Sequence, residues 1–341
     1  MTRPPTAVVI CAYTLDRWDD LHEAVLSAAA QQPVPDEIVL VIDHNDALLE
    51  RAGRELGPEV PGLRVVANVR RQGLSGARNT ALELLDAEVV AFLDDDACAD
   101  PEWLVRLTAP YVDPAVIAVG GSATPRWSDG AARPVTLPAT DGQAWGELDW
   151  VVGCSYQGQP TSTRTVRNVM GCNMSFRREV FVSVGGFSED LGRVGRTPLG
   201  CEETELCIRA TTARPDARVV FEPTARVRHH VSDDRLTWSY LLHRCYAEGV
   251  SKAAVSAMVG QDKALATERG YVTTVLPRGV LRCLGGAVRD GGARLRALAG
   301  AAAIVGGLSA TVLGYARGKA AAPVVLGRSA PRLEQASGAA R

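Results

Sequence analysis

Short apolar runs alternate with amphipathic segments over the N-terminal part of the chain. Such runs are typical of strands buried on both faces of a parallel sheet, and apolar residues three or four apart predict helices. The predicted strands lie at residues 7–11, 37–42, 63–67 and 89–93, and the predicted helices at 18–30, 48–56 and 75–85. Strands that alternate with helices in this way form right-handed βαβ units. The pattern therefore predicts an α/β fold, with a mostly parallel central sheet and helices on both of its faces.

Three aspartates, Asp94, Asp95 and Asp96, directly follow the fourth predicted strand. Their carboxylates therefore lie at the carboxyl edge of the sheet, where open α/β sheets bind ligands. Crowded carboxylates repel one another unless a cation lies between them, and oxygen ligands suit Mg²⁺ or Mn²⁺, which would also hold a diphosphate. The alternative is a solvated acidic turn, but a buried strand that leads into the acids favours a metal site. The segment Asp100-Pro101-Glu102 then predicts the start of a new helix.

The loop after the first strand disfavours several nucleotide-binding classes. It reads Cys11-Ala12-Tyr13-Thr14 and lacks the G-x-G-x-x-G pattern of dinucleotide-binding domains. The phosphate-loop pattern G-x-x-x-x-G-K-[ST] occurs nowhere in the sequence. The missing glycine-rich loop also disfavours a sugar-phosphate nucleotidyltransferase.

Acids and histidines in the second half are candidates for chemistry. Glu202, Glu203 and Glu205 fall in the first turn of a predicted helix, where acids also occur because they complement the helix dipole. His229 and His230 follow a strand-like segment, and a histidine there either ligates a metal or makes an ordinary hydrogen bond.

An aromatic-rich segment, residues 125–168, shows little periodicity. It contains Trp127, Trp145, Trp150 and Tyr156. Sugar rings stack on aromatic faces, but tryptophan packs more often in a core. The sequence leaves both uses open.

The composition is that of a globular protein, with 46% hydrophobic and 22% charged residues among 341. The net charge of −2 is unevenly distributed: ten basic and two acidic residues give 278–341 a charge of +8, so that the preceding part carries −10. A basic tail favours an anionic surface as partner.

The eight cysteines show no C-x-x-C pair and no zinc-type spacing, and the sequence opens without a secretory signal. We therefore expect free thiols in a reducing compartment.

The basic tail also contains an uncharged stretch of twenty residues, 297–316. That length can span a bilayer, but Ala and Gly dominate it and contribute little insertion energy. Upstream, apolar residues alternate with Arg278, Arg282 and Arg289 as in an interfacial helix, which Pro277 should interrupt. The tail is therefore a weak span, an in-plane or hairpin anchor, or a soluble helical tail that packs on the preceding part of the chain. We expect association with a membrane surface and not with nucleic acid, because no nucleic-acid-binding motif occurs.

An ordered set of motifs resembles the family 2 glycosyltransferases, which are inverting, nucleotide-sugar-dependent enzymes of the A-type glycosyltransferase fold. The motifs cover roughly residues 7 to 250, and each is weak alone but specific in this order. They are VVICAY at 8–13, Asp43, GLSGARN at 73–79, FLDDD at 92–96, GCNMSFR at 171–177, GGF at 185–187 and CEETEL at 201–206.

The resemblance implies a nucleotide-sugar site at the carboxyl edge of the sheet. In that site Asp43 accepts a hydrogen bond from the base, Asp94 faces the ribose, and Arg78 reaches the nucleotide or pairs with the aspartates. Gly73 and Ser75 give backbone room and a helix N-cap, although turn glycines are common for structural reasons alone. The implied donor-binding residues are Ala12, Tyr13, Thr14, Asp43, Gly73, Ser75, Arg78, Asp94 and Asp95.

The resemblance also implies a metal site, a base and an acceptor site. Asp94 and Asp96 would belong to the family's DXD motif, and together with His229, which completes the metal shell in some of these enzymes, they would hold Mg²⁺ or Mn²⁺. The family usually shows Glu-Asp where this chain has Glu202-Glu203, so the base would be Glu203, one methylene longer, with Glu202 second. The base takes the proton of the acceptor hydroxyl, which attacks opposite the departing nucleoside diphosphate. The implied acceptor-binding residues are Trp150, Gly171, Asn173 and Met174.

Residues 150–156 and 200–209 resemble a subset described as glucosyl-dolichyl-phosphate glucuronosyltransferase-like, which implies UDP-glucuronate as donor and a polyprenyl-linked glucose as acceptor. We thus expect a metal-dependent, inverting transferase of cell-envelope polysaccharide synthesis, at the cytoplasmic face of the cell membrane where nucleotide sugars are made. The alternatives are a non-catalytic nucleotide-binding scaffold, disfavoured because the acids are present, and a nucleotidyltransferase.

Two domains are predicted: a catalytic domain, residues 1–250, and a helical, basic tail, residues 251–341. The catalytic domain is predicted to consist of a nucleotide-sugar half (1–122) and an acceptor half (123–250).

Overall fold

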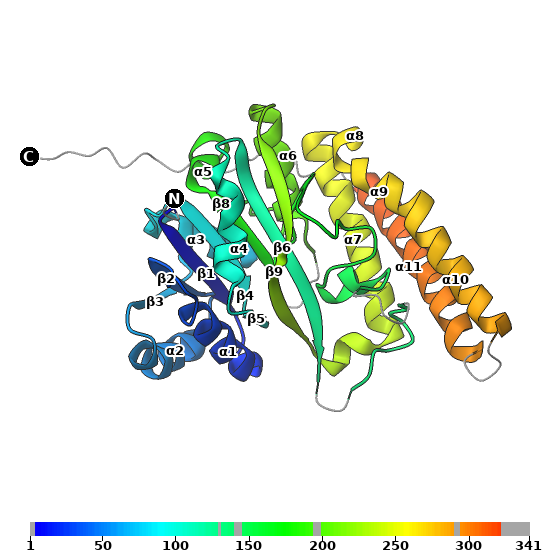
Figure 1. Cartoon of the computed structure of the whole chain (residues 1–341), viewed down its shortest axis with the longest axis horizontal. Coiled ribbons are helices and arrows are strands. Elements are labelled where there is room, and N and C mark those ends of the chain that lie inside the picture. Colours follow the sequence, from blue (N-terminus) through cyan, green and yellow to red (C-terminus); the bar gives the residue numbers. More distant parts are fainter. Residues whose placement is uncertain (1–3, 129–130, 140–144, 194–198, 290–293, 322–341) are drawn as a thin grey trace, which may run out of the picture.

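The four apolar runs near the start of the chain form neighbouring parallel strands. The computed structural model describes residues 4–128, 131–139, 145–193, 199–289 and 294–321 (Figure 1). Strand β1 lies between β2 and β4, which sets Cys11 beside both Val41 and Asp94. These strands are β1 (Thr6–Ala12), β2 (Glu37–Ile42), β3 (Leu63–Ala67) and β4 (Val89–Asp94).

The second half of the sheet is mixed. Strand β8 is antiparallel to β4 and to β6, while β6 and β9 run parallel to each other. In the described part of the chain the strands form one nine-stranded sheet in the order β3-β2-β1-β4-β8-β6-β9-β5, with β7 beside β9. The predicted α/β class is therefore confirmed. The strands of this half are β5 (Ala97–Ala99), β6 (Val116–Trp127), β7 (Arg164–Val166), β8 (Asn173–Arg177) and β9 (Arg218–Val231).

Helices cover both faces of the sheet, and each face has its own core. Successive residues of β1 point to opposite sides, so Val8 packs with Leu21 and Trp103, whereas Val9 packs with Phe92 and Phe176. The helices here are α1 (Trp18–Ala29), α2 (Asp46–Glu59), α3 (Leu74–Leu84), α4 (Trp103–Thr108), α5 (Arg178–Val184) and α6 (Glu202–Ala213). Short 3₁₀ turns are η1 (Leu15–Arg17), η2 (Ala109–Val112), η3 (Asp149–Val152) and η4 (Asp233–Leu236).

The C-terminal helices pack against the rest of the chain instead of standing apart from it. Figure 1 shows α11 running beside α7, with α10 packed against α11. Glycines permit the close approach of α7 and α11: a Cβ on Gly249 would lie 2.0 Å from the carbonyl oxygen of Thr311, and one on Gly314 would lie 2.0 Å from that of Tyr246. These elements are α7 (Trp238–Val259), α8 (Gln261–Ala264), α9 (Ala266–Gly270), the π-helical turn η5 (Tyr271–Val275), α10 (Leu276–Arg289) and α11 (Arg294–Ala321).

Helix α11 contains the uncharged stretch 297–316. By length and composition it is the one helix among the described residues that could cross a membrane, with 33% of its most apolar window buried in the protein. Pro277 was expected to interrupt the upstream helix, and it lies just after the π-helical turn η5, where the N–H of Leu276 donates to the carbonyl of Tyr271 and α10 then continues the helical chain. Likewise, the helix expected at Asp100 begins only at Trp103, whose N–H donates to the carbonyl of Asp100.

All eight cysteines lie in the described residues and are free, and seven of them are buried. The predicted free thiols are thus present in the fold. Burial raises the pKa of Cys11 to about 12 even though Arg78 lies nearby. These thiols are therefore protonated packing groups at neutral pH.

Candidate active site

A cavity of about 1010 Å³ connects the carboxyl ends of β1 and β4 with the C-terminal helices. Its wall includes the three aspartates, the two glutamates at the start of α6, and residues of α7, η5 and α11. The regions predicted to bind donor, metal and acceptor therefore share one space. The C-terminal helices, predicted as a separate tail, form part of its wall.

The acids after β4 meet a histidine from β9. Asp94, Asp96 and His229 offer ligand atoms that lie within 4.8 Å of one another. His229 is brought there because β9 pairs with β5, where it lies opposite Ala97. Its Nε2 is 3.1 Å from Oδ1 of Asp96, and both side chains are buried. Two carboxylates and an imidazole are a donor set that suits Mn²⁺ or Mg²⁺.

Two buried polar atoms in or next to the cluster of Asp94, Asp96 and His229 lack a partner among the described residues. They are Nδ1 of His229 and Oδ2 of the neighbouring Asp95. Buried polar atoms are almost always hydrogen-bonded, so unpartnered ones indicate a place where a ligand or water completes the site. The residues present therefore fit a divalent cation with its waters.

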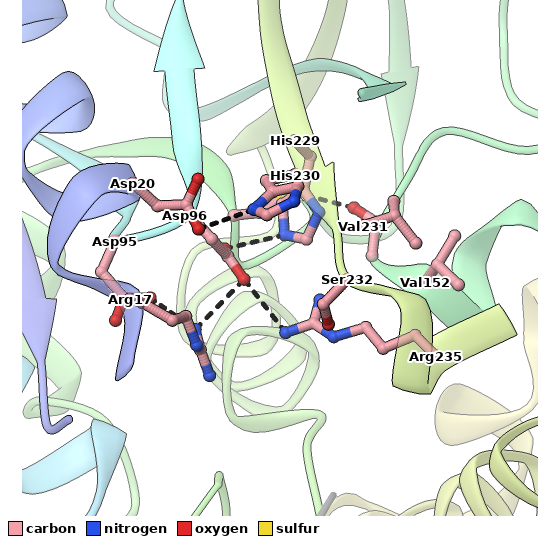
Figure 2. Close-up of polar contacts among 12 residues, drawn as sticks. Arg17, Asp20, Asp95, Asp96, Val152, His229, His230, Val231, Ser232 and Arg235 are labelled. Carbon is pink, nitrogen blue, oxygen red and sulfur yellow. Dashed lines mark hydrogen bonds and ion pairs between the residues drawn. The ribbon is translucent and has the colours of Figure 1, made fainter. Parts of the chain in front are cut away.

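Two arginines that the sequence did not single out contact the acidic cluster (Figure 2). Arg17 in η1 lies 2.8 Å from Asp95 and 3.1 Å from Asp96, and Arg235 in η4 lies 3.0 Å from Asp96. Burial opposes ionisation of Asp96, but His229 and Arg235 hold its pKa well below the usual value. Burial raises the pKa of Asp95 to about 7, although Arg17 counteracts it. The site is therefore acidic with cationic walls, which suits a diphosphate together with a metal.

The donor end is organised by Asp43 at the end of β2. Its Oδ1 accepts a hydrogen bond of 2.7 Å from Asn68, and its Oδ2 accepts one of 2.9 Å from the N–H of Gly73. Asp43 lines the cavity with Ala12 and Tyr13. His44 Nδ1 also lies 2.9 Å from Oδ1, so the second lone pair of Oδ2 is the one left for a base N–H.

Three residues predicted to bind the donor support the loops instead of lining the cavity. Thr14 caps η1 by accepting from the N–H of Asp16. Gly73 adopts a φ of 130° before α3 and holds Asp43. The hydroxyl of Ser75 donates to the carbonyl of Leu191, so Ser75 is not the expected N-cap of α3. Direct contact of these three residues with the nucleotide stays a prediction.

Arg78 links the metal cluster to the glutamates. Its guanidinium lies 2.7 Å from Glu202 and 3.5 Å from Asp94, and donates to the carbonyl of Gly171 at 3.0 Å. The side chain is only 2% exposed and lies near the Phe92 ring, 5.7 Å from its centre. Burial opposes its charge, but Glu202 and Asp94 raise the pKa of Arg78 above the ordinary value. The predicted pairing with the aspartates is present, and it extends to Glu202.

The two glutamates at the start of α6 have different surroundings. Glu202 is buried and paired with Arg78, whereas Glu203 accepts a hydrogen bond of 3.2 Å from the Thr204 hydroxyl and is less buried. Both line the cavity. Burial, reinforced by the charge of Glu202, raises the pKa of Glu203 to about 7. A carboxylate with such a pKa can accept a proton near neutral pH.

The predicted acceptor residues divide into two pairs. Trp150 and Gly171 line the cavity. Asn173 and Met174 are 0% exposed in β8, where Asn173 donates to the carbonyls of Ser122 and Ala225 and Met174 packs in the core. Their predicted role as acceptor ligands is corrected, since both are structural.

The aromatic residues of the 125–168 segment divide in a similar way. Tyr156 lines the cavity with Trp150. Trp145 is buried and packs edge-on against Phe221 at 6.5 Å, and Trp127 packs in the C-terminal core. Core packing is therefore present for Trp127 and Trp145, and an acceptor surface at Trp150 and Tyr156 stays a prediction.

A second charged cluster, which the sequence did not reveal, lines the same cavity beyond Glu203. It comprises Arg167, Arg244, Glu248, Lys252 and Glu268. Three of its members lie one turn apart on α7, a spacing that is equally common on ordinary surface helices. Only the packing of α7 against α6 and α9 turns them toward the cavity.

Comparisons with known proteins agree with this geometry. The family model for glycosyl transferase family 2 matches residues 7–185. A glucosyl-dolichyl phosphate glucuronosyltransferase of Haloferax volcanii is 33% identical over 256 residues, which are 75% of this chain and 78% of that protein. Succinoglycan biosynthesis protein ExoM of Rhizobium meliloti is 28% identical over 252 residues, covering 70% and 71% of the two chains.

Solved structures show the same fold. The mannosyltransferase PcManGT of Pyrobaculum calidifontis, in complex with GDP-Man and Mn²⁺, has a TM-score of 0.60 at 19% identity and covers 94% of this chain and 88% of its own. GalNAc-T7 with UDP, GalNAc and Mn²⁺ has a TM-score of 0.50 at 16% identity and covers 80% and 56%. The chain therefore has the A-type glycosyltransferase fold.

Proposed function

The chain belongs to glycosyltransferase family 2, and on that premise we propose that it is a metal-dependent, inverting enzyme that transfers a sugar from a UDP-sugar to a lipid-linked acceptor. One observation carries this proposal. The cavity that holds the cluster of Asp94, Asp96 and His229 also holds Glu203. Arg78 pairs with Asp94 of the cluster and with Glu202, the residue before Glu203. A scaffold without activity has no need of a carboxylate with a raised pKa beside a metal-type cluster.

The donor is held at the β4 end of the cavity. Asp94, Asp96 and His229 would hold Mn²⁺ or Mg²⁺, which when bound neutralises charge on the departing diphosphate. Arg17 and Arg235 already lie at the acids and contribute positive charge there. The two structural neighbours contain a nucleotide or nucleotide-sugar and Mn²⁺, which supports this assignment.

Glu203 acts as the base. It accepts the proton of the acceptor hydroxyl while that oxygen attacks the anomeric carbon on the side opposite the nucleoside diphosphate. Attack from the opposite side inverts the anomeric configuration. Glu202 is unsuitable for this step because its carboxylate is engaged by Arg78.

The donor and acceptor follow from the Haloferax volcanii relative, whose description names a glucosyl-dolichyl phosphate and a glucuronosyl group. By extension, UDP-glucuronate is the donor and a polyprenyl phosphate-linked glucose the acceptor for this chain. A sugar hydroxyl must lose a proton to react, whereas a polyprenyl phosphate is already anionic. The raised pKa of Glu203 is therefore useful for a sugar acceptor and not for a bare lipid phosphate.

A lipid-linked acceptor favours a position at a membrane, and we propose its cytoplasmic face because nucleotide sugars are made there. Several large apolar side chains of α10 and α11 are exposed, and basic residues flank them. The exposed apolar residues include Leu281 (69%), Val288 (87%), Leu295 (82%), Val305 (54%) and Leu313 (64%). Because α11 packs along α7, we favour an in-plane anchor over a span.

A transfer assay tests this function. The purified chain is incubated with a short isoprenyl phosphate-linked glucose and, in turn, UDP-glucuronate, UDP-glucose and GDP-mannose, with Mn²⁺, Mg²⁺ or a chelator. We expect a product from UDP-glucuronate that requires the metal, with inverted anomeric configuration by NMR. Transfer that persists in chelator would overturn the metal dependence. Absence of transfer from every donor would overturn the proposed reaction.

A further inference from the structure

We propose that Arg167, Arg244 and Lys252 bind the phosphodiester of the acceptor, and that η5 and α11 receive its first isoprene units. This inference rests on the proposed function and identifies the acceptor end of the same cavity. The ligand class is an isoprenoid whose phosphate is linked to a saccharide.

The three cations belong to a chain of alternating charges. Arg244 lies 3.0 Å from Glu248, which lies 3.4 Å from Lys252. Lys252 in turn lies 2.7 Å from Glu268, and Glu268 lies 2.6 Å from Arg167. Three cations against two carboxylates leave the cluster with a net charge of +1. One phosphodiester, with a single negative charge, would neutralise it.

The cations retain donors for a ligand. A lysine ammonium has three N–H donors, and the carboxylates of Glu248 and Glu268 occupy two of those on Lys252. Arg244 has five donors, of which the hydrogen bond to Glu248 uses one. Its guanidinium lies over the ring of Trp150, 5.7 Å from the centre, which holds it at the cavity wall.

The cluster adjoins the base. The thiol of Cys201, two residues before Glu203, lies 3.4 Å from Glu248. Lys252 is also close enough for its charge to counteract the burial that raises the pKa of Glu203. A phosphate bound at the cluster is therefore near the hydroxyl that Glu203 would deprotonate.

Beyond the cations the cavity wall becomes apolar. Tyr271 and Val272 of η5 line it there, together with Leu308, Val312 and Tyr315 of α11. The hydroxyl of Tyr315 lies 3.4 Å from that of Ser256, one turn beyond Lys252 on α7. The apolar wall is thus continuous with the charged cluster.

The wall presents groups in the order of the acceptor's own parts. Glu203 faces the sugar hydroxyl, the cations face the phosphate, and η5 and α11 face the isoprene chain. A soluble sugar acceptor would use the first of these alone. This sequence of surfaces therefore identifies an amphiphilic phosphodiester.

Lys252→Met tests the proposal without dismantling the cluster, because Glu248 keeps Arg244 and Glu268 keeps Arg167. The probes are farnesyl phosphate-linked glucose, uncharged farnesyl glucoside and glucose 1-phosphate, titrated in the presence of UDP and Mn²⁺. We expect Lys252→Met to weaken binding of the charged lipid probe by about tenfold or more, as for a lost hydrogen bond between charged groups. Binding of the uncharged lipid should change by less than about twofold, and Lys252→Arg should restore the charged probe.

Val312→Gln tests the apolar wall at a residue that is 58% exposed. It should weaken the binding of both farnesyl probes by about threefold, the effect of losing a small apolar contact, and leave the binding of glucose 1-phosphate unchanged.

Two results would overturn the phosphate site: Lys252→Met weakens the binding of the charged and uncharged lipids equally, or it changes the binding of neither. Glucose 1-phosphate that binds as tightly as the charged lipid would overturn the isoprenoid site.

The same samples separate this inference from the proposed function. Binding of UDP with Mn²⁺ is measured first and should be equal in wild type, Lys252→Met and Val312→Gln. Wild-type protein that binds UDP and Mn²⁺ but none of the three acceptor probes would overturn the acceptor site alone. Wild-type protein that binds no nucleotide would overturn the proposed function itself.

Discussion

Replacement of Glu203 by glutamine should abolish transfer and at the same time stabilise the protein. In the folded chain burial raises the pKa of this carboxyl from 4.5 to about 7. Its ionisation therefore costs about 3 kcal/mol more in the folded than in the unfolded state, at 1.36 kcal/mol for each pKa unit. Glutamine has a similar shape and no charge, so it avoids this cost.

The pH dependence follows from the direction of the shift. Between pH 4.5 and pH 7 the folded state keeps a proton on Glu203 that the unfolded state loses. The wild type therefore loses stability as the pH rises through this range, and above it the penalty is complete. The Glu203→Gln variant should exceed the wild type in free energy of unfolding by about 3 kcal/mol at pH 8 and by about 1 kcal/mol or less at pH 5.

The same substitution, Glu203→Gln, should lower the catalytic rate although it raises the stability. Loss of a general base lowers the rate by about 10² to 10⁴, while binding of UDP with metal should be unchanged. In the wild type, kcat/KM should fall about tenfold for each pH unit below the Glu203 pKa of about 7.

Denaturant titrations at pH 5 and pH 8 and initial rates over the same range provide the assay. Glu50→Gln, on a side chain that is 79% exposed, is the matched control and should change neither quantity. Glu202→Gln should lower stability, because Arg78 loses a buried partner. A Glu203→Gln variant that retains more than a tenth of the wild-type rate, or one whose stability gain is the same at both pH values, would refute the assignment of Glu203.

Two further predictions concern packing and charge. Arg78→Ala leaves the buried carboxylate of Glu202 without its 2.7 Å partner and should lower the free energy of unfolding by about 3–5 kcal/mol. Adding Glu202→Gln to this variant should restore most of that loss. A loss below about 1 kcal/mol in the single variant would contradict the buried pair. Gly249→Ala places a Cβ 2.0 Å from the carbonyl oxygen of Thr311 and should destabilise by about 1–3 kcal/mol through separation of α7 and α11. The control is Gly53→Ala in the exposed part of α2, where the new Cβ would have no other atom within 4 Å. It should raise the free energy of unfolding by about 0.5–1 kcal/mol. Equal melting temperatures for the two variants would refute the close contact between α7 and α11.

Local patterns predicted the first half of the fold closely. Strands β2 and β3 have the predicted bounds, because a short run rich in β-branched residues that ends at polar residues marks both ends of a strand, whether it is buried like β2 or half-exposed like β3. The aspartates after β4 were recognisable for the same reason, since the strand end directs them to the ligand edge.

Contacts between distant segments were beyond the sequence. Arg235 reaches Asp96 only because η4 follows β9, and Lys252 reaches the cavity only because α7 packs beside α6. A sequence motif also does not show which of its residues line the cavity and which are buried in the core. Asn173 and Gly171 belong to the same motif, yet the strand buries Asn173 and leaves Gly171 at the cavity wall.

A calorimetric titration of UDP with Mn²⁺ tests the donor site most directly, on wild type and on Asp96→Asn, with Asp86→Asn as control. The Asp86 side chain is 98% exposed and distant from the cluster. We expect wild type and Asp86→Asn to bind UDP only when Mn²⁺ is present, and Asp96→Asn to lose this metal-dependent binding. Nucleotide binding by Asp96→Asn that equals wild type, or wild-type binding that is the same in chelator, would contradict a metal and donor site at Asp94, Asp96 and His229.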